Sequence, residues 1–333
     1  MKSNNNFQKA LELIDNSNSI LITSHSRPDG DACGSIVAMA EALAGLGKKV
    51  KPLLLSELPR WYEFLFTEKP AILDKDITVE QLTEGRSVEF DLIFIVDTNS
   101  LNQLPKFEQY LKQTDLPVLV IDHHVTSDGL GSVELIDTAA AATALIIFDL
   151  FKHAKWQFNK KIAYALFVAI ATDTGWFHFA NTDSRVYTSC AELIDIGVKP
   201  TEIYHDLYQS FSQQRFKLMM AMLNTLELHL DGRYATQHIL QTDFEQTGAR
   251  GMDTENLIDE CHRIGSVEAA VLFVELKDGR IKCSLRSRGA VDVRKIAQKF
   301  GGGGHIMAAG VHLPGPLKNA KKLINAEVEK QFQ

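Results

Sequence analysis

Three side chains that can bind a metal ion lie between residues 25 and 31, close to the N-terminus. In the segment SHSRPDGDACGS, which spans residues 24–35, His25 is followed by Asp29 and Asp31. Each residue alone has a common structural explanation, because aspartates that follow strands often cap helices or form turns. The pattern gains meaning from further acidic and imidazole groups along the chain, which are Asp97, Asp122, His123, His124 and Asp173.

Short apolar runs precede these groups and indicate which elements position them. The runs SILITSH, DLIFIVDT and PVLVIDHH end in His25, Asp97 and the Asp122–His124 group. Such continuous apolar runs are typical of parallel strands that are buried on both faces. Because ligands bind at the carboxyl ends of strands in open α/β sheets, we expect these groups to meet at one edge. Asp173 follows the apolar helical run AYALFVAIA.

The clustered groups predict a site for divalent metal ions. Carboxylates packed at one sheet edge would repel each other unless cations neutralise them. Carboxylate and imidazole ligands without thiolate favour Mn²⁺, with Mg²⁺, Co²⁺ or Fe²⁺ as alternatives. The charges of Asp29, Asp31, Asp97 and Asp173 match two divalent ions. Two metals about 3.5–4 Å apart form a clamp for phosphoryl hydrolysis, with a bridging water of lowered pKa as the nucleophile.

A second group of residues, in the C-terminal half, is suited to binding phosphate. In SLRSRG, Ser284, Arg286 and Arg288 alternate along a predicted strand and should share one face. In the following run GGGGHIMAAG, Gly303 and Gly304 lack side chains, so their backbone N–H groups can approach a phosphate. We expect a short helix to begin at His305, where its N-terminus would favour an anion.

The order of the predicted elements divides the chain into two domains. Strands at 19–25, 49–55, 91–98 and 117–124 alternate with helices at 33–47, 139–153 and 160–171, which predicts an α/β domain with a parallel sheet. Pro52 favours an edge position for the second strand. Strand patterns at 233–240, 268–276 and 280–287 predict a smaller α/β domain with a mixed sheet. We place the catalytic domain at 1–190, a helical connector at 191–215 and the second domain at 216–333.

Composition is that of an ordinary globular protein and limits its partners. The chain has 333 residues, of which 45% are hydrophobic, and a net charge of −7. An acidic protein is poorly suited to coating long duplex nucleic acid. Four scattered cysteines without a CxxC pair argue against structural zinc and disulfides. Apolar stretches at 139–148 and 163–171 are too short to span a bilayer, which needs about 20 residues, and no signal peptide is evident. We expect a cytoplasmic protein without a membrane partner.

The motifs, taken in order, resemble those of a known family. HSRPDGD, VDT, DHH and TDTG look like the four motifs of the DHH phosphoesterases, and SLRS followed by GGGGHIMAAG looks like the family's associated C-terminal domain. The resemblance covers about residues 15–333. The two-domain size most resembles the bifunctional oligoribonucleases, which degrade nano-RNA and dephosphorylate pAp (3′-phosphoadenosine 5′-phosphate). Proteins labelled exopolyphosphatase-related belong to the same group.

The resemblance implies a role for each motif residue. One Mn²⁺ would be held by His25, Asp29 and Asp97. The other would be held by Asp31, Asp97, His123 and Asp173, with Asp97 bridging the two. Asp122 would orient an imidazole, and His124 would face the scissile phosphate or the leaving oxygen. The far phosphate or nucleotide end of the substrate would be bound by Ser284, Arg286, Gly303, Gly304 and His305.

Several functions share these motifs. The leading hypothesis is a Mn²⁺-dependent hydrolase of short oligoribonucleotides and pAp, and the resemblance makes a homodimer plausible. The alternative is a phosphodiesterase for cyclic dinucleotides such as c-di-AMP, or for its linear product pApA. An exopolyphosphatase or pyrophosphatase fits the metal motifs but explains the GGGGH segment less well. A non-catalytic nucleotide sensor is disfavoured, because all six predicted metal ligands are present.

Overall fold

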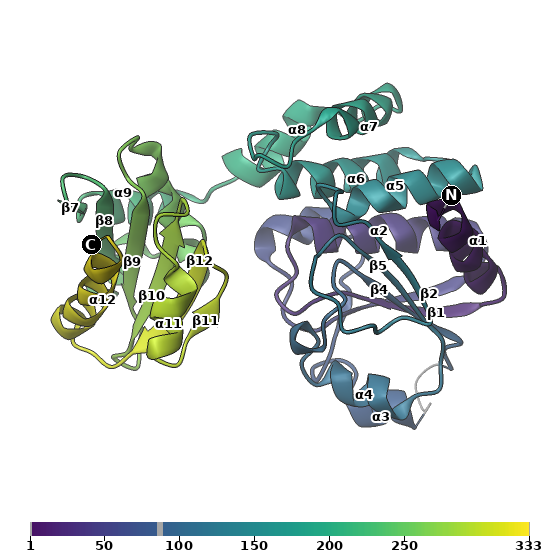
Figure 1. The fold of residues 1–333 in the computed structure, drawn as a ribbon, viewed down its shortest axis with the longest axis horizontal. Helices are drawn as coiled ribbons and strands as arrows, with labels where there is room; N and C mark the ends of the chain where they lie inside the picture. Colours follow the sequence, from purple (N-terminus) through teal and green to yellow (C-terminus); the bar gives the residue numbers. More distant parts are fainter. Residues whose placement is uncertain (1, 85–88, 333) are drawn as a thin grey trace. The chain divides into compact units, whose positions relative to one another are not determined.

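The computed structural model describes residues 2–84 and 89–332 of the chain. It contains two compact units, Met1–Gln209 and Ser210–Gln333, and each unit is built around one six-stranded sheet (Figure 1). The region 191–215, where we expected a helical connector, contains the end of α7 (Ser184–Asp195), α8 (Pro200–Tyr204), a π-helical turn η3 (His205–Gln209) and the start of α9 (Gln213–Leu223). Across the described residues, no helix has both the length and the apolar character that a membrane crossing requires.

The sheet of the first unit is parallel throughout, as its apolar strands predict. In spatial order its strands are β3 (Ala71–Ile72), β2 (Lys49–Leu54), β1 (Ser19–Thr23), β4 (Leu92–Val96), β5 (Val118–Asp122) and β6 (Val133–Ile136). Thr23 pairs with Ile95 and Val96 pairs with Ile121, so the carboxyl ends of β1, β4 and β5 meet at one edge. The edge position predicted for β2 is wrong. The short strand β3 pairs with the two leucines that follow Pro52, beyond the residue that lacks an N–H group.

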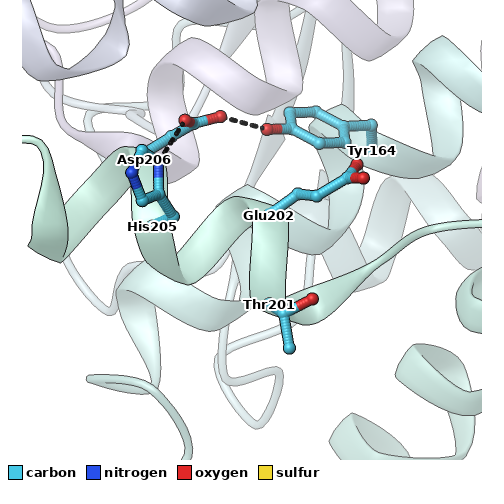
Figure 2. A pocket seen from close by; sticks show the side chains of 5 residues that line it. All are labelled: Tyr164, Thr201, Glu202, His205 and Asp206. Atoms are coloured by element: carbon cyan, nitrogen blue, oxygen red, sulfur yellow. Dashed lines mark hydrogen bonds and ion pairs between the residues drawn. The ribbon is translucent and has the colours of Figure 1, made fainter.

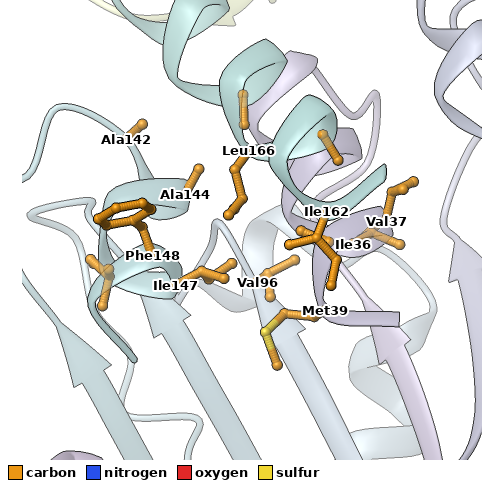
Figure 3. Close-up of a cluster of buried hydrophobic side chains, with 14 of the residues drawn as sticks. Ile36, Val37, Met39, Val96, Ala142, Ala144, Ile147, Phe148, Ile162 and Leu166 are labelled. Carbon is orange, nitrogen blue, oxygen red and sulfur yellow. The ribbon is translucent and has the colours of Figure 1, made fainter. Parts of the chain in front are cut away.

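Helices cover both faces of this sheet (Figure 1). One face carries α1 (Lys2–Asp15), α2 (Gly30–Gly45), α5 (Thr143–Ala154) and α6 (Lys160–Asp173), and the other carries α3 (Val79–Thr83) and α4 (Phe107–Gln113). The short helical turns η1 (Arg60–Leu65) and η2 (Leu101–Gln103) lie in loops. Phe94 and Val96 join the core beneath α2, α5 and α6, part of which is drawn in Figure 3, whereas Ile93 and Ile95 pack with Phe107 on the other side. Both sides of β4 are therefore buried.

The helices α2 and α6 can approach each other closely because α2 contains glycine at the contact. A Cβ atom on Gly34 would lie 2.4 Å from the carbonyl oxygen of Ala165, and one on Gly30 would lie 2.2 Å from Oγ1 of Thr172. Helix α2 begins at Gly30, three residues earlier than the sequence pattern indicated. The close approach brings the first turn of α2 beside the last turn of α6, and both turns carry predicted metal ligands.

The second unit contains the mixed sheet that we predicted, because β8 and β9 are parallel and the other pairs are antiparallel. Its strands, in spatial order, are β11 (Gly303–Gly304), β12 (Ala308–Leu313), β10 (Ile281–Ser287), β9 (Ala269–Glu275), β8 (Tyr234–Ile239) and β7 (Glu227–His229). One face packs against α11 (Val293–Lys299) and α12 (Leu317–Gln331). The other face packs against α9, α10 (Gln241–Thr247), η4 (Gly251–Thr254) and η5 (Leu257–Arg263). The predicted α/β fold class is confirmed for both units.

The short helix that we predicted after the glycine run is wrong. Residues Ala308–Leu313 form strand β12, in which Ala309, Val311 and Leu313 are buried and alternate with more exposed residues. This alternation suits a strand that is half-buried against α11 and α12, and it outweighs the helix propensity of the two alanines. His305 lies in the turn between β11 and β12, where its backbone N–H donates to the carbonyl of Ala308. There is therefore no helix N-terminus at His305 that could bind an anion.

Candidate metal centre

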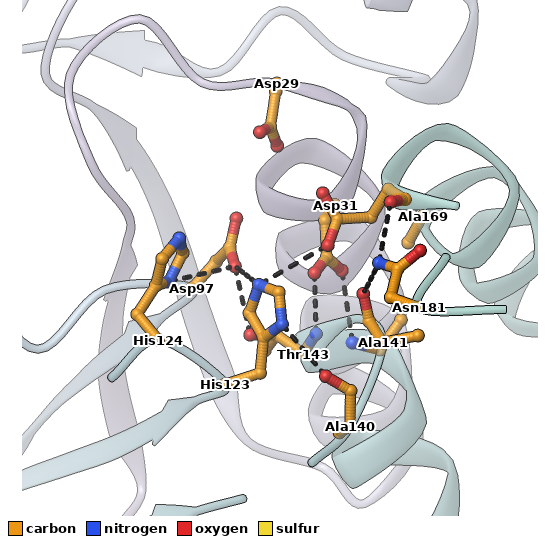
Figure 4. A network of polar contacts seen from close by, with 12 residues as sticks. Asp29, Asp31, Asp97, His123, His124, Ala140, Ala141, Thr143, Ala169 and Asn181 are labelled. Atoms are coloured by element: carbon orange, nitrogen blue, oxygen red, sulfur yellow. Dashed lines mark hydrogen bonds and ion pairs between the residues drawn. The ribbon is translucent and has the colours of Figure 1, made fainter. Parts of the chain in front are cut away.

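The carboxyl edge of the parallel sheet brings together all of the acidic and imidazole residues that the sequence singled out. Figure 4 shows part of this group, with Asp97 between His123 and His124. Among the described residues, three overlapping groups have potential ligand atoms that all lie within 4.8 Å of one another. These groups are His25, Asp29 and Asp97; Asp31, His123 and Asp173; and Asp97, His123 and His124. Strand ends supply the histidines, Asp97 and Asp122, while the start of α2 and the end of α6 supply the other three aspartates.

Asp97 lies at the centre of this arrangement, directly after β4. Its Oδ2 is 3.3 Å from Nε2 of His25, and its Oδ1 is 3.6 Å from Nε2 of His123. The side chain is buried, and the backbone has a φ of 62°, a left-handed conformation that is uncommon outside glycine. Such strained conformations concentrate at functional sites, where the surrounding structure enforces them. The carboxylate therefore presents one oxygen to each side of the cluster.

Two partly buried histidines, His25 and His123, are oriented so that they can bind cations. Nδ1 of His25 lies 3.0 Å from the carbonyl oxygen of Ser26, and Nδ1 of His123 lies 3.1 Å from that of Ala140. Because a carbonyl oxygen only accepts hydrogen bonds, each Nδ1 carries the proton and each Nε2 presents a lone pair. These lone pairs face the oxygens of Asp97, and acceptors that face one another need a cation between them. Metal-bound histidines commonly have this second hydrogen bond.

The start of α5 holds two of the carboxylates in place. The backbone N–H of Thr143 donates to Oδ2 of Asp31 at 2.6 Å, and that of Ala144 donates to Oδ1 at 3.1 Å. The hydroxyl of Thr143 also donates to Oδ1 of Asp97 at 3.0 Å. We did not predict a role for Thr143, because a threonine in an alanine-rich segment gives no signal of its contacts. Its position at the first turn of a helix, where N–H groups are free, is the one clue available.

Three aspartates of the centre, Asp31, Asp97 and Asp173, have raised pKa values in the absence of metal. Burial, followed by repulsion from Asp97, raises the pKa of Asp31 well above its usual range. Burial and repulsion from Asp29 act in the same way on Asp97, and they raise the pKa of Asp173 to about 7. Within the described part of the chain, no lysine or arginine pairs with any of these carboxylates. Divalent cations would supply the missing positive charge, so the donor set fits them.

His124 differs from its neighbour because a carboxylate holds its ring. Nδ1 of His124 is 2.7 Å from Oδ1 of Asp122, and this hydrogen bond is the main cause of a raised pKa at His124. Asp122 is fully buried, and its Oδ2 has no hydrogen-bond partner. His124 is half exposed, which leaves Nε2 available to an incoming group. The proximity of His124 to Asp97 and His123 also allows it to act as a ligand.

The predicted phosphate-binding residues of the second unit lie on β10, on β11 and in the turn that follows β11, and β12 lies between these two strands. Ser284 and Arg286 share the partly exposed face of the strand, and Ser284 is paired with Gly310, which is itself paired with Gly303. Arg288 lies beyond the end of the strand, and its guanidinium donates to the carbonyls of His262 and Gly265. The sequence pattern correctly placed Arg286 but did not reveal its ion pair with Asp259, in which Nε is 3.2 Å from Oδ1.

A separate hollow in the first unit is not suited to phosphate (Figure 2). It is lined by Tyr164, Thr201, Glu202, His205 and Asp206. The phenol of Tyr164 donates to a carboxylate oxygen of Asp206 at 3.0 Å. Two carboxylates without a lysine or arginine in the lining would repel an anionic substrate, so we assign the phosphate chemistry to the centre at the sheet edge.

These features together define a metal-dependent phosphoesterase. They are the parallel sheet, the acidic and imidazole groups at its carboxyl edge, and the second unit with its mixed sheet. The chain belongs to the DHH family of phosphoesterases. The model of the DHH family, N-terminal domain, matches residues 19–172, and the model of the DHHA1 domain matches residues 231–333. The family assignment agrees with the resemblance seen in the sequence motifs, and it identifies the chain as a hydrolase.

Curated relatives cover most of the chain. The bifunctional oligoribonuclease and PAP phosphatase NrnA of Thermus thermophilus is 34% identical over 89% of this chain and 84% of its own length. The protein of the same name from Bacillus subtilis is 27% identical over 88% of this chain and 89% of its own length. The cyclic-di-AMP phosphodiesterase PdeA of Listeria monocytogenes is 28% identical over 98% of this chain but only 48% of its own length.

Solved structures share the fold. An exopolyphosphatase-related protein from Bacteroides fragilis superposes with a TM-score of 0.90 at 23% identity, over 98% of this chain and 96% of that one. The RecJ structure from Thermus thermophilus, which is in complex with Mn²⁺, has a TM-score of 0.55 at 13% identity, over 98% of this chain and 55% of that one. At these identities the likeness concerns the fold alone.

Proposed function

We propose that this phosphoesterase hydrolyses short oligoribonucleotides to mononucleotides and converts pAp to AMP, using two divalent metal ions. The observation that carries the proposal is the pair of ligand groups on either side of Asp97, whose two oxygens face different histidines. The NrnA relatives, which are named for both activities, cover most of this chain and most of their own length. Their names support the substrate class proposed here.

The ligand sets that we propose follow the clustered groups. His25, Asp29 and Asp97 would hold one ion, and Asp31, Asp97, His123 and Asp173 would hold the other. Mn²⁺ suits the mixture of carboxylate and imidazole ligands better than Mg²⁺ does, with Co²⁺ as a further alternative. Such ions, when bound, neutralise charge on phosphate oxygens and lower the pKa of water so that it can attack.

His124 and Asp122 would act on the substrate side of the centre. The raised pKa of His124 favours an imidazolium, which can donate through Nε2 to the scissile phosphate or the leaving oxygen. Asp122 holds the ring through Nδ1 and stabilises its charge. Asp97, His124 and Asp122 would therefore be the catalytic set, with Asp122 acting through the histidine.

The second unit would bind the phosphate or nucleotide end that is not being cleaved. We assign this contact to Ser284, Arg286, Gly303, Gly304 and His305. The ion pair with Asp259 holds Arg286 in position, and an incoming phosphate would compete with that carboxylate for the guanidinium. Recognition through phosphate carries little sequence information, so we expect weak base preference.

A substrate panel tests the proposal. Purified protein with Mn²⁺ is incubated with pAp, ribonucleotides of two to five residues, pApA, c-di-AMP and inorganic polyphosphate. We expect mononucleotides from the short RNAs and phosphate from pAp, with both activities lost in Asp97→Ala. Release of neither product would refute the proposal, and full activity in Asp97→Ala would refute the two-metal account. Size-exclusion chromatography of the same sample tests the homodimer that we infer for a cytoplasmic member of this family.

Cyclic-dinucleotide hydrolysis is the second candidate. It is favoured by the likeness to PdeA of Listeria monocytogenes, although this chain spans about half the length of that protein. Cleavage of c-di-AMP in the panel without cleavage of pAp or short RNA would select this alternative. Cleavage of polyphosphate alone would select the exopolyphosphatase reading.

A further inference from the structure

The exposed part of the second sheet carries cations that the proposed substrate contacts do not use. Along β10, Lys282, Ser284 and Arg286 lie on the partly exposed face, while the residues between them are buried. The same face of the neighbouring strands β8 and β9 is covered by α9 and η5. Around β10 and β12 this face is only partly covered, and there Ser284 and Arg286 are already assigned to phosphate.

The register of β12 places a second basic side chain beside Lys282. Lys282 is paired with His312, Ser284 with Gly310 and Arg286 with Ala308. Residues directly opposite in an antiparallel pair point to the same face, with Cβ atoms about 4.5–5.5 Å apart. His312 is exposed, so Lys282 and His312 form a basic pair at one end of the partly covered face, while Arg286 lies toward the other end.

Among the described residues, this basic pair has no carboxylate to neutralise it. In the part of the chain that the structure describes, neither Lys282 nor His312 lies within ion-pair distance of a carboxylate, whereas Arg286 is paired with Asp259. The pair lies on the surface of a protein whose net charge is −7. An anionic group of a ligand would supply the opposite charge that the chain does not.

The surface between the two basic ends is open to a ligand. A Cβ atom on Gly303 would meet no atom within 4 Å, and one on Gly310 would meet only a carbonyl oxygen at 3.6 Å. Packing does not require glycine at these two positions. It does require glycine at Gly302 and Gly304, where a Cβ atom would lie 2.3 and 2.4 Å from backbone oxygens. An extended ligand can therefore lie against this surface from Arg286 to Lys282.

We propose that Lys282 and His312 form a second phosphate subsite, which binds the additional nucleotides of oligoribonucleotides longer than two residues. The proposal rests on the proposed function, because it concerns the same substrates. Lys282 lies four residues from Arg286 along the strand, or about 13 Å at a rise of about 3.3 Å per residue. The two cations therefore bind phosphates of different nucleotides. pAp and a 5′-phosphorylated dinucleotide have one phosphate besides the scissile one, and Arg286 would bind it.

The test compares substrates of different length in the full chain. Steady-state kinetics with Mn²⁺ are measured for pAp, a 5′-phosphorylated dinucleotide and a pentanucleotide, using Lys282→Gln, His312→Asn and the double variant. We expect the KM for the pentanucleotide to rise about fivefold in each single variant and further in the double variant, with kcat unchanged. The kinetics with pAp and the dinucleotide should stay within twofold of wild type.

Two further measurements show whether a rise in KM comes from the loss of a phosphate contact or from the loss of positive charge in general. They are the salt dependence of KM and the kinetics of a control variant. Removing one phosphate contact should lower the slope of log KM against log salt by about 0.7 for a single strand. Lys318→Gln is the matched control, because Lys318 is exposed on α12, which covers the opposite face of the sheet. It should leave both the KM and the slope unchanged.

Direct binding keeps this inference distinct from the proposed function. Anisotropy of a labelled pentanucleotide in EDTA measures binding without catalysis, and Lys282→Gln should weaken it about fivefold. Unchanged pentanucleotide affinity and KM in the double variant would overturn the subsite, even if pAp hydrolysis confirms the function. Loss of RNA hydrolysis in wild type, with anisotropy still sensitive to Lys282, would instead refute the function and retain the anionic subsite.

Discussion

The hydroxyl of Thr143 donates a hydrogen bond to Oδ1 of Asp97 across 3.0 Å, while the backbone N–H of the same residue donates to Asp31. One residue at the first turn of α5 thus holds a carboxylate from each of the two proposed metal sites. The side chain of Thr143 is fully buried. Its contacts fix how both carboxylates are aimed before any ion binds.

Replacing Thr143 should weaken metal binding without removing a ligand. Thr143→Val keeps the shape but loses the hydroxyl, and we expect Mn²⁺ affinity to fall about 10–100-fold, as is typical for groups that support a metal ligand. Thr143→Ser keeps the hydroxyl and should stay close to wild type. Titration calorimetry with Mn²⁺ measures the difference. Equal affinities in the valine and serine variants would show that the hydrogen bond to Asp97 is unimportant.

The Asp97→Asn variant should have lower activity than wild type, and its metal-free form should be more stable. The change removes a buried carboxylate whose pKa is raised by burial and by repulsion from Asp29, and asparagine tolerates the left-handed backbone at this position. Activity should fall by more than the 10–100-fold expected for a supporting residue. The melting temperature of the metal-free protein should rise by a few degrees, at about 2–4 °C per kcal/mol. A lower melting temperature in EDTA would contradict the repulsion argument.

Stability of the metal-free protein should fall as the pH rises. The folded pKa values of Asp31, Asp97 and Asp173 lie above the unfolded value of about 3.9. The folded state therefore binds more protons than the unfolded chain, and the free energy of unfolding decreases as pH rises toward and through the pKa of about 7 at Asp173. Melting in EDTA between pH 5.5 and 8 measures the slope.

Mn²⁺ should oppose this dependence. Cations compete with protons for the same carboxylates, so added Mn²⁺ should raise the melting temperature more at pH 8 than at pH 5.5. Asp97→Asn provides the control, because it should flatten the slope in EDTA. A melting temperature in EDTA that is independent of pH would show that electrostatic repulsion between the aspartates does not destabilise the folded protein.

Asp122→Asn should move the basic limb of the pH–rate profile. The hydrogen bond from His124 to Asp122 is the main cause of the raised pKa of His124, so removing the carboxylate charge lowers that pKa. If the imidazolium donates to the substrate, kcat/KM should decline at lower pH than in wild type. At pH 8 the loss should be about 10–100-fold. An unshifted profile would assign His124 to another role, such as metal binding.

Much of the fold could be predicted because the residue pattern of each strand indicates whether its faces are buried or exposed. Runs such as IFIV are apolar on both sides, as expected for a strand between two helical layers. The edge position of β2 was predicted wrongly. Pro52 lacks an N–H group only at its own position, so it does not prevent the two leucines that follow it from pairing with β3. The helix predicted after His305 was wrong because the tertiary packing of alternate residues in β12 outweighs local propensity.

For the candidate metal centre, too, some features could be predicted from the sequence and others could not. The sequence by itself determined which groups could meet, since His25, Asp97 and Asp122–His124 each follow an apolar strand and parallel strands end at one edge. Only the tertiary structure decided how those groups are held. Thr143 lies 112 residues from Asp31 in the chain, and Asp259 lies 27 from Arg286. Hydrogen bonds and ion pairs of this kind depend on distances of about 3 Å between distant segments, and no local pattern of residues encodes such distances.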